Sequence, residues 1–155
     1  MKGNAKVIEL LNEILTNELT AINQYFAHAK MCQHWGFATL GAKIREESID
    51  EMRHADQVID RILYLEGMPN LQRLGKVSIG ENVPEQLKAD LALEVAAVTF
   101  LNECISECTK AGDNGTLELV KSILVSEEQH IDWIEEQLGL IDSVGLQNYL
   151  ATTLG

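Results

Sequence analysis

The chain has 155 residues, of which 46% are hydrophobic and 23% charged, and its formal net charge is −12 at pH 7. These values fit one soluble globular domain with one core and exclude a disordered tail. Only two prolines and 5% aromatic residues argue against an all-β sandwich or barrel. The acidic balance argues against nucleic acid or an anionic membrane surface as a partner.

The N-terminal segment and the cysteines indicate where the protein works. No run of 18 apolar residues occurs, and the first residues lead into an amphipathic segment rather than an apolar signal core. We therefore expect no export and a cytoplasmic location. Three cysteines, Cys32, Cys104 and Cys108, cannot all pair within one chain. The i,i+4 spacing of Cys104 and Cys108 favours core thiols over a metal-binding pair.

Apolar residues recur at helical spacing along four long segments and one short one. This periodicity predicts helices over about 5–35, 37–66, 85–111, 116–139 and 143–152. Gly67 is expected to end the second helix as its C′ residue. The 18 residues from Gly67 to Pro84 hold both prolines and are predicted to form a connection.

The lengths of the connections indicate the topology. Short turns after the first and third helices predict two antiparallel hairpins. A helix of roughly 28 residues is about 42 Å long, whereas the long connection reaches roughly 59 Å when extended. It can therefore return along the whole bundle. We predict a single all-α domain over 1–155, a ferritin-like four-helix bundle with one long crossover and a short fifth C-terminal helix.

Each long helix carries a carboxylate within its apolar stripe. These residues are Glu18, Glu51, Glu94 and Glu127. Burying four carboxylates in one core requires a compensating positive charge. Two of them open a Glu-x-x-His sequence, Glu51 with His54 and Glu127 with His130. The i,i+3 spacing places each pair on one helix face.

The spacing of these residues repeats along the chain. Glu18 and Glu51 are 33 residues apart, as are Glu94 and Glu127, and Glu18, Glu51 and His54 each have a residue of the same type 76 positions later. The chain thus resembles two similar hairpins that share one centre, with the ligand set of ferritin-like di-iron carboxylate proteins.

Carboxylate and imidazole ligands suit divalent iron or manganese. In the predicted centre, Glu51 and Glu127 bridge two metal ions about 3.5–4 Å apart. Glu18 and His54 complete one site, and Glu94 and His130 complete the other. Oxidation of two Fe²⁺ ions together delivers two electrons to one O₂ or H₂O₂.

At these motifs the sequence resembles the bacterioferritins over nearly its whole length. The matching stretches are 17–19 with 21–26, 47–52, 54–56, 65–67, 130–133 and 145–150. The resemblance implies a cytoplasmic shell of ~24 identical subunits, built from twofold dimers, that oxidises Fe²⁺ with O₂ or H₂O₂ and stores ferric mineral. It also implies haem b held by Met52 from each subunit of a dimer, and a small ferredoxin as electron donor.

Met52 follows Glu51, so it lies about 100° round the helix from the core face. Without the resemblance, packing in a dimer interface would explain this methionine. Tyr25 matches an aromatic beside the family's di-iron centre, although a core-packing role fits equally. Glu46 stands where many members carry a histidine that helps iron reach the cavity, and Val58 stands where some carry tyrosine.

Three further residues are interpreted as structural. His28 and His34 are predicted to be surface or interface groups, and Trp133 is predicted to pack near the site rather than to carry electrons. Two alternative functions remain: a peroxide-consuming bundle enzyme with manganese or iron, and a haem electron carrier whose di-metal site is structural.

Overall fold

Five helices account for nearly all of the ordered secondary structure. The computed structural model describes residues 1–155, and the helices are α1 (Ala5–His34), α2 (Ala38–Tyr64), α3 (Val83–Ala111), α4 (Asn114–Val144) and α5 (Leu146–Ala151). Side chains cap three of the long helices at their first turn: those of Asn4, Asn82 and Asp113 accept backbone N–H groups. None of the helices is both long and apolar enough to cross a membrane.

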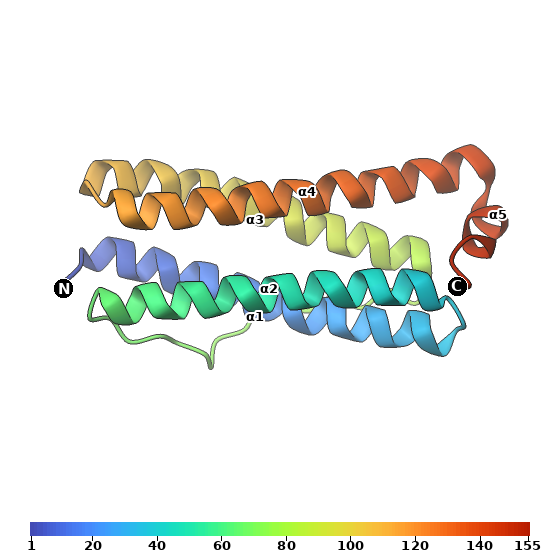
Figure 1. Cartoon of the computed structure of the whole chain (residues 1–155), viewed down its shortest axis with the longest axis horizontal. Helices are drawn as coiled ribbons and strands as arrows, with labels where there is room; N and C mark the ends of the chain where they lie inside the picture. The colour runs from blue at the N-terminus through green and yellow to red at the C-terminus, as the bar shows by residue number, and fades with distance from the viewer.

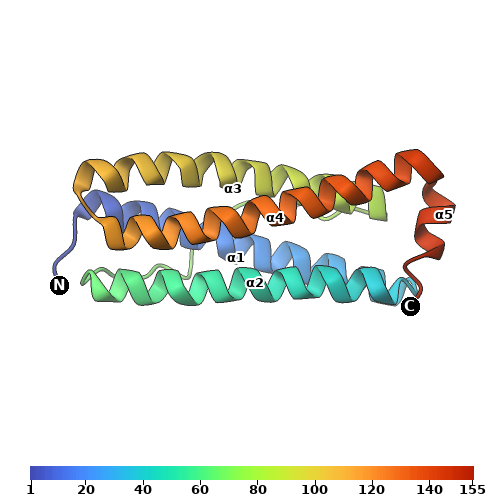
Figure 2. The same ribbon diagram turned by 45° about the horizontal axis from the view of Figure 1, so that its top comes forward.

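The long helices form two antiparallel hairpins packed side by side, α1 with α2 and α3 with α4 (Figure 1). The crossover from Leu65 to Asn82 returns along the bundle, so that α3 starts at the end where α2 began (Figure 2). The short helix α5 lies across that same end. The predicted ferritin-like bundle with one long crossover and a short fifth helix is therefore confirmed.

Two apolar clusters divide the core along the bundle axis. One gathers around Leu11, Leu15 and Ile62 and includes Cys104 and Cys108, which are core thiols as expected. The other gathers around Ala29, Ile44, Leu87 and Ile134, towards α5. On each long helix, the glutamate at position 18, 51, 94 or 127 lies between the residues of one apolar cluster and those of the other.

The crossover is held by polar side chains spaced four residues apart on α1, which we call the α1 ladder: Asn12, Thr16, Thr20, Gln24 and His28. Asn12 accepts the N–H of Asn70 at 2.8 Å and donates to the carbonyl of Met68. The next four side chains accept N–H groups from Arg73 (side-chain Nε), Gly75, Ser78 and Gly80, at 2.8–3.1 Å. The ladder satisfies donors in a segment that has no secondary structure of its own.

The structure corrects three expectations. His28 is not a surface group, because its side chain is fully buried where α1 packs against α3 and the crossover. The left-handed residue after α2 is Glu66 (φ 63°), not Gly67; a Cβ on Gly67 would lie 2.7 Å from the Cγ2 atom of Ile8, so this glycine is needed for close packing. Helix α4 continues through Gly139, beyond its predicted end, and stops at Gly145, where φ is 87°.

Candidate metal centre

All six residues predicted to bind metal meet in the middle of the bundle. All six residues are buried, with exposed fractions between 1% and 8%. They are Glu18 on α1, Glu51 and His54 on α2, Glu94 on α3, and Glu127 and His130 on α4. Each helix contributes the face that also carries its apolar stripe. The helical periodicity alone thus directs these polar side chains inward.

The six side chains form two overlapping groups of potential ligands. One group contains Glu18, Glu51, His54 and Glu127, and the other contains Glu51, Glu94, Glu127 and His130. The ligand atoms within each group lie within 4.8 Å of one another. Glu51 and Glu127 belong to both groups, which is the geometry that two bridging carboxylates require.

Both imidazoles face the carboxylates through Nδ1. His54 Nδ1 lies 3.5 Å from Glu18 and 3.4 Å from Glu127. His130 Nδ1 lies 3.1 Å from Glu51 and 3.5 Å from Glu94. Each histidine therefore approaches the terminal glutamate of its own predicted site and both shared glutamates, the second of which lies 4.0 Å from His54 and 3.6 Å from His130.

Most of the polar atoms of this cluster have no hydrogen-bond partner. The unpaired buried atoms include both carboxylate oxygens of Glu51, one oxygen each of Glu18, Glu94 and Glu127, and Nδ1 of both histidines. Buried polar groups without partners are costly. Carboxylate oxygens and imidazole nitrogens directed at a common point fit divalent iron or manganese, which would supply the missing interactions.

Without metal, the cluster retains protons. Burial, reinforced by the neighbouring Glu18 and Glu94 carboxylates, raises the pKa of Glu51 well above its usual range. Burial and the nearby Glu127 raise the pKa of Glu94 to about 8. Burial acts in the opposite direction on the histidines, but the surrounding carboxylates outweigh it and raise the pKa of His54 to about 10 and that of His130 to about 9.

Two neighbouring groups hold ligands in orientation. The Tyr25 hydroxyl donates a hydrogen bond to Glu94, so this tyrosine does lie beside the centre. Asp50 Oδ2 lies 3.4 Å from His130 Nε2, on the far side of the imidazole from the carboxylates. A carboxylate at this nitrogen favours the tautomer whose Nδ1 lone pair is free to bind metal.

Glu47 is a buried acid that the sequence analysis did not single out. Its side chain is 2% exposed, one of its oxygens is unpaired, and burial raises its pKa to about 8. Its position, four residues before Glu51 and seven before His54, places it on the ligand face of α2. That spacing was the available signal in the sequence. Glu46 itself is exposed.

A small cavity reaches the carboxylates between α1 and α3. It has a volume of about 70 Å³ and is bordered by Asn17, Ala21, Ala96 and Ala97 as well as by four of the glutamates. The small alanine side chains leave this space open where the two helices pass each other.

Met52 lies outside the core, as its place on the helix predicted. It is 55% exposed and borders a groove of about 270 Å³ with Ile22, Phe26, Ile49 and Arg45. The Arg45 guanidinium lies over the Phe26 ring, 5.4 Å from its centroid. The groove is an apolar surface with a thioether and one cation at its edge.

The remaining residues singled out from the sequence are not among the potential ligands. Trp133 is half-buried against the second apolar cluster, and the Lys43 amino group lies 5.6 Å from its ring centroid, which fits a packing role. His34 is exposed near the end of α1, and Val58 is fully buried in the first cluster.

Comparison with known proteins agrees with the fold. The ferritin-like domain family matches residues 8–144. Bacterioferritin BfrA of Mycobacterium tuberculosis is 49% identical over 97% of this chain and 95% of its own length. The chain belongs to the bacterioferritin family. Bacterioferritins of Rhodobacter capsulatus and Streptomyces coelicolor are each 47% identical, covering 96% and 99% of this chain and 92% of their own lengths.

Proposed function

We propose that this bacterioferritin oxidises Fe²⁺ at the buried centre and stores the ferric product within a shell of identical subunits. The observation that carries this proposal is the pair of ligand groups that share Glu51 and Glu127. Two shared carboxylates keep two ions close enough to be oxidised together, and four carboxylates balance the charge of two divalent cations.

The chemistry of the iron substrate is a two-electron step shared between two ions. Two Fe²⁺ each lose one electron, and O₂ takes both electrons and two protons to become H₂O₂; with H₂O₂ as oxidant the products are two waters. The chain binds the ions through the six predicted ligands. Asp50 orients His130, and Tyr25 holds Glu94, so the site is partly arranged before the ions arrive.

The cavity between α1 and α3 offers the ions a short route to the centre. Its polar wall consists of Asn17 and the glutamates themselves, so an entering cation meets oxygen ligands while it loses its water. The protons held by the metal-free cluster leave when the ions bind.

The groove at Met52 fits a haem shared between two subunits. The exposed Met52 thioether is a soft ligand that would hold haem iron, and a twofold-related copy would cover the groove and bring a second Met52. Arg45 would neutralise a haem propionate. Haem b, one per dimer, would supply an electron route for reductive iron release, and the family resemblance suggests a small ferredoxin as the electron donor.

The wider assembly follows from the same family relationship. We propose the ~24-subunit shell built from twofold dimers and the cytoplasmic location that the sequence predicted. The exposed apolar residues Val144, Leu146 and Leu154 near the C-terminus lie at one end of the bundle, where a symmetry-related subunit would cover them.

Removal of one shared carboxylate tests the ferroxidase proposal. Glu127→Ala should slow the fast phase of Fe²⁺ oxidation by about a hundredfold or more, since even changes beyond the direct ligands cost 10–100-fold at metal sites. Glu51→Ala should behave in the same way. The matched control is Glu128→Ala, because Glu128 is the exposed neighbour of Glu127. A fast oxidation phase that survives in Glu127→Ala would show that the centre is elsewhere.

The two alternative functions are distinguished by product and by retained iron. A peroxide-consuming enzyme would turn over H₂O₂ repeatedly without accumulating ferric mineral. A haem electron carrier with a structural di-metal site would retain no mineral in the purified shell. Ferric iron accumulated in proportion to the Fe²⁺ supplied would favour storage over both.

A further inference from the structure

The last two residues of the α1 ladder, Gln24 and His28, also donate hydrogen bonds to a buried carboxylate on α3. Asp90 is 2% exposed, and its Oδ1 accepts hydrogen bonds from Gln24 Nε2 at 2.8 Å and from His28 Nδ1 at 2.9 Å. Since His28 Nε2 accepts the N–H of Gly80, the imidazole proton is on Nδ1 and is donated to Asp90. We call Asp90, Gln24 and His28 the Asp90 clamp.

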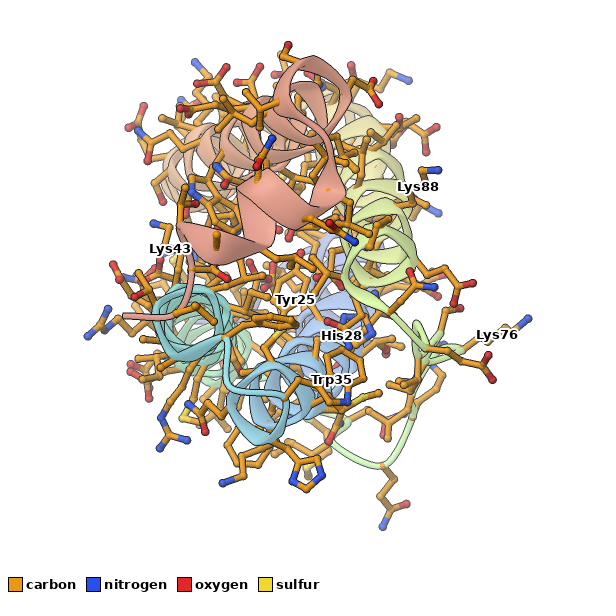
Figure 3. All side chains as sticks on the ribbon, turned by 90° about the vertical axis from the view of Figure 1, so that its right-hand side faces the viewer. Tyr25, His28, Trp35, Lys43, Lys76 and Lys88 are labelled. Carbon is orange, nitrogen blue, oxygen red and sulfur yellow. The ribbon has the colours of Figure 1, made fainter.

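The clamp lies directly beside one half of the metal centre. Glu94 follows Asp90 by one helical turn, so both side chains leave the same face of α3. Tyr25 lies between Gln24 and His28 on α1 and donates to Glu94. Tyr25 and His28 both point into the bundle interior (Figure 3). One turn of α3 is therefore attached at both ends to one turn of α1.

The other half of the centre has no such attachment. The 76-residue repeat that relates Glu18 to Glu94 also relates Ile14 to Asp90, and it pairs Tyr25 with Leu101 and His28 with Cys104. Ile14, Leu101 and Cys104 all belong to the first apolar cluster. The bundle can thus fill these positions with apolar side chains, and packing alone does not explain the polar set around Asp90.

We propose that Asp90 is a positioning residue that preorganises the Glu94–His130 half of the metal centre. Bound by Gln24 and His28, it fixes the position of α3 against α1 at the turn from which Glu94 reaches the metal. The half containing Glu18 and His54 is then independent of it. This inference rests on the proposed metal centre and assigns unequal roles to its two halves.

Cobalt binding measures the two halves separately. Glu18→Ala leaves the group that contains Glu94 and His130, and Glu94→Ala leaves the group that contains Glu18 and His54. Metal-free full-length protein of each variant is titrated with Co²⁺, and binding is followed by visible absorption. Asp90→Leu should weaken Co²⁺ binding about tenfold to a hundredfold in the Glu18→Ala background and less than about twofold in the Glu94→Ala background.

Two further variants separate positioning from charge and from general stability. Asp90→Asn keeps an oxygen that accepts from Gln24 and His28, so it should restore Co²⁺ binding to near that of the parent. Thr20→Val removes a hydrogen bond to the crossover on the same ladder, at Gly75, without touching α3. It should lower the melting temperature but leave Co²⁺ affinity unchanged. If Asp90→Leu fails to fold, His28→Leu provides the same comparison.

The outcomes are decisive in either direction. Equal weakening in both backgrounds, no weakening, or failure of Asp90→Asn to restore binding would overturn the positioning role. The proposed function has a separate test: it is wrong if the unmodified protein does not oxidise Fe²⁺. The Co²⁺ comparison does not depend on that activity.

Discussion

Metal binding at the centre should release protons, because the metal-free cluster holds them at neutral pH. The pKa values of His54 and His130, about 10 and about 9, mean that both imidazoles are protonated at pH 7. Metal ions bind imidazole only through a free lone pair, so both protons leave when two ions bind. The carboxyl groups of Glu51 and Glu94 add to this number.

The expected number of released protons follows from the pKa values of these four side chains. With a pKa of about 8, Glu94 is roughly nine-tenths protonated at pH 7. Burial and neighbouring carboxylates raise the pKa of Glu51 well above its usual range, so it also contributes. Binding of two divalent ions at pH 7 should therefore release about three to four protons. For each proton that must leave, the apparent affinity for metal falls about tenfold with every pH unit below the pKa of the group that holds the proton.

Calorimetric titration of the metal-free protein with Co²⁺ gives the proton number directly. The apparent binding enthalpy is measured in buffers of different ionisation enthalpy, and the slope is the number of protons released. Raising the pH from 7 to 10 should reduce this number, since His130 and then His54 lose their protons before metal arrives. The matched control is Asp56→Asn, which removes an exposed acid from the same helix. Release of one proton or none at pH 7 would refute the protonated cluster.

Three other predictions concern haem, assembly and stability. Met52→Leu should give an assembled, ferroxidase-active shell without the haem Soret band and with slow reductive iron release; a retained Soret band would show that the ligand is wrong. Deletion of residues 143–155 should abolish or weaken the shell while far-UV circular dichroism still reports the helical bundle, and elution of the truncated protein as the full cage would contradict this. The metal-free protein should lose stability between about pH 5 and pH 9, because the folded state binds more protons than the unfolded state wherever Glu94 and His130 have raised pKa values. Thermal melts across that range check the sign, and a melting temperature that rises with pH would contradict it.

The helices and the convergence of the six candidate ligands were predictable because both depend on spacing within single helices. Glu51 and His54 share a face at i,i+3 whatever surrounds them, and the same holds for Glu127 and His130. The repeat of 76 residues then predicted that the two hairpins would meet at one centre, and the structure places the six side chains there. The ends of helices were less predictable, as Glu66 and Gly139 show, because a helix also continues or stops according to what packs beside it.

Glu47 shows where local spacing stops being sufficient. Its place on the ligand face of α2 was visible in the sequence, but spacing alone does not show that the side chain is buried. Whether a side chain at the edge of a helix stripe is buried depends on the neighbouring helix. Here burial in the bundle raises the pKa of Glu47; the neighbouring Glu94 adds to this rise and His130 opposes it.

By itself, the sequence determined the helices, their antiparallel order and the six side chains that meet in the core, since each rests on periodicity or chain length. Only the tertiary structure decided that the polar stripe of α1 faces the crossover rather than solvent, and that His28 is buried against Asp90. The physical reason is that water and the N–H groups of a loop require the same polar side chains from a helix. A stripe such as Asn12, Thr16 and Thr20 therefore has the same pattern in both environments, and only the folded chain distinguishes them.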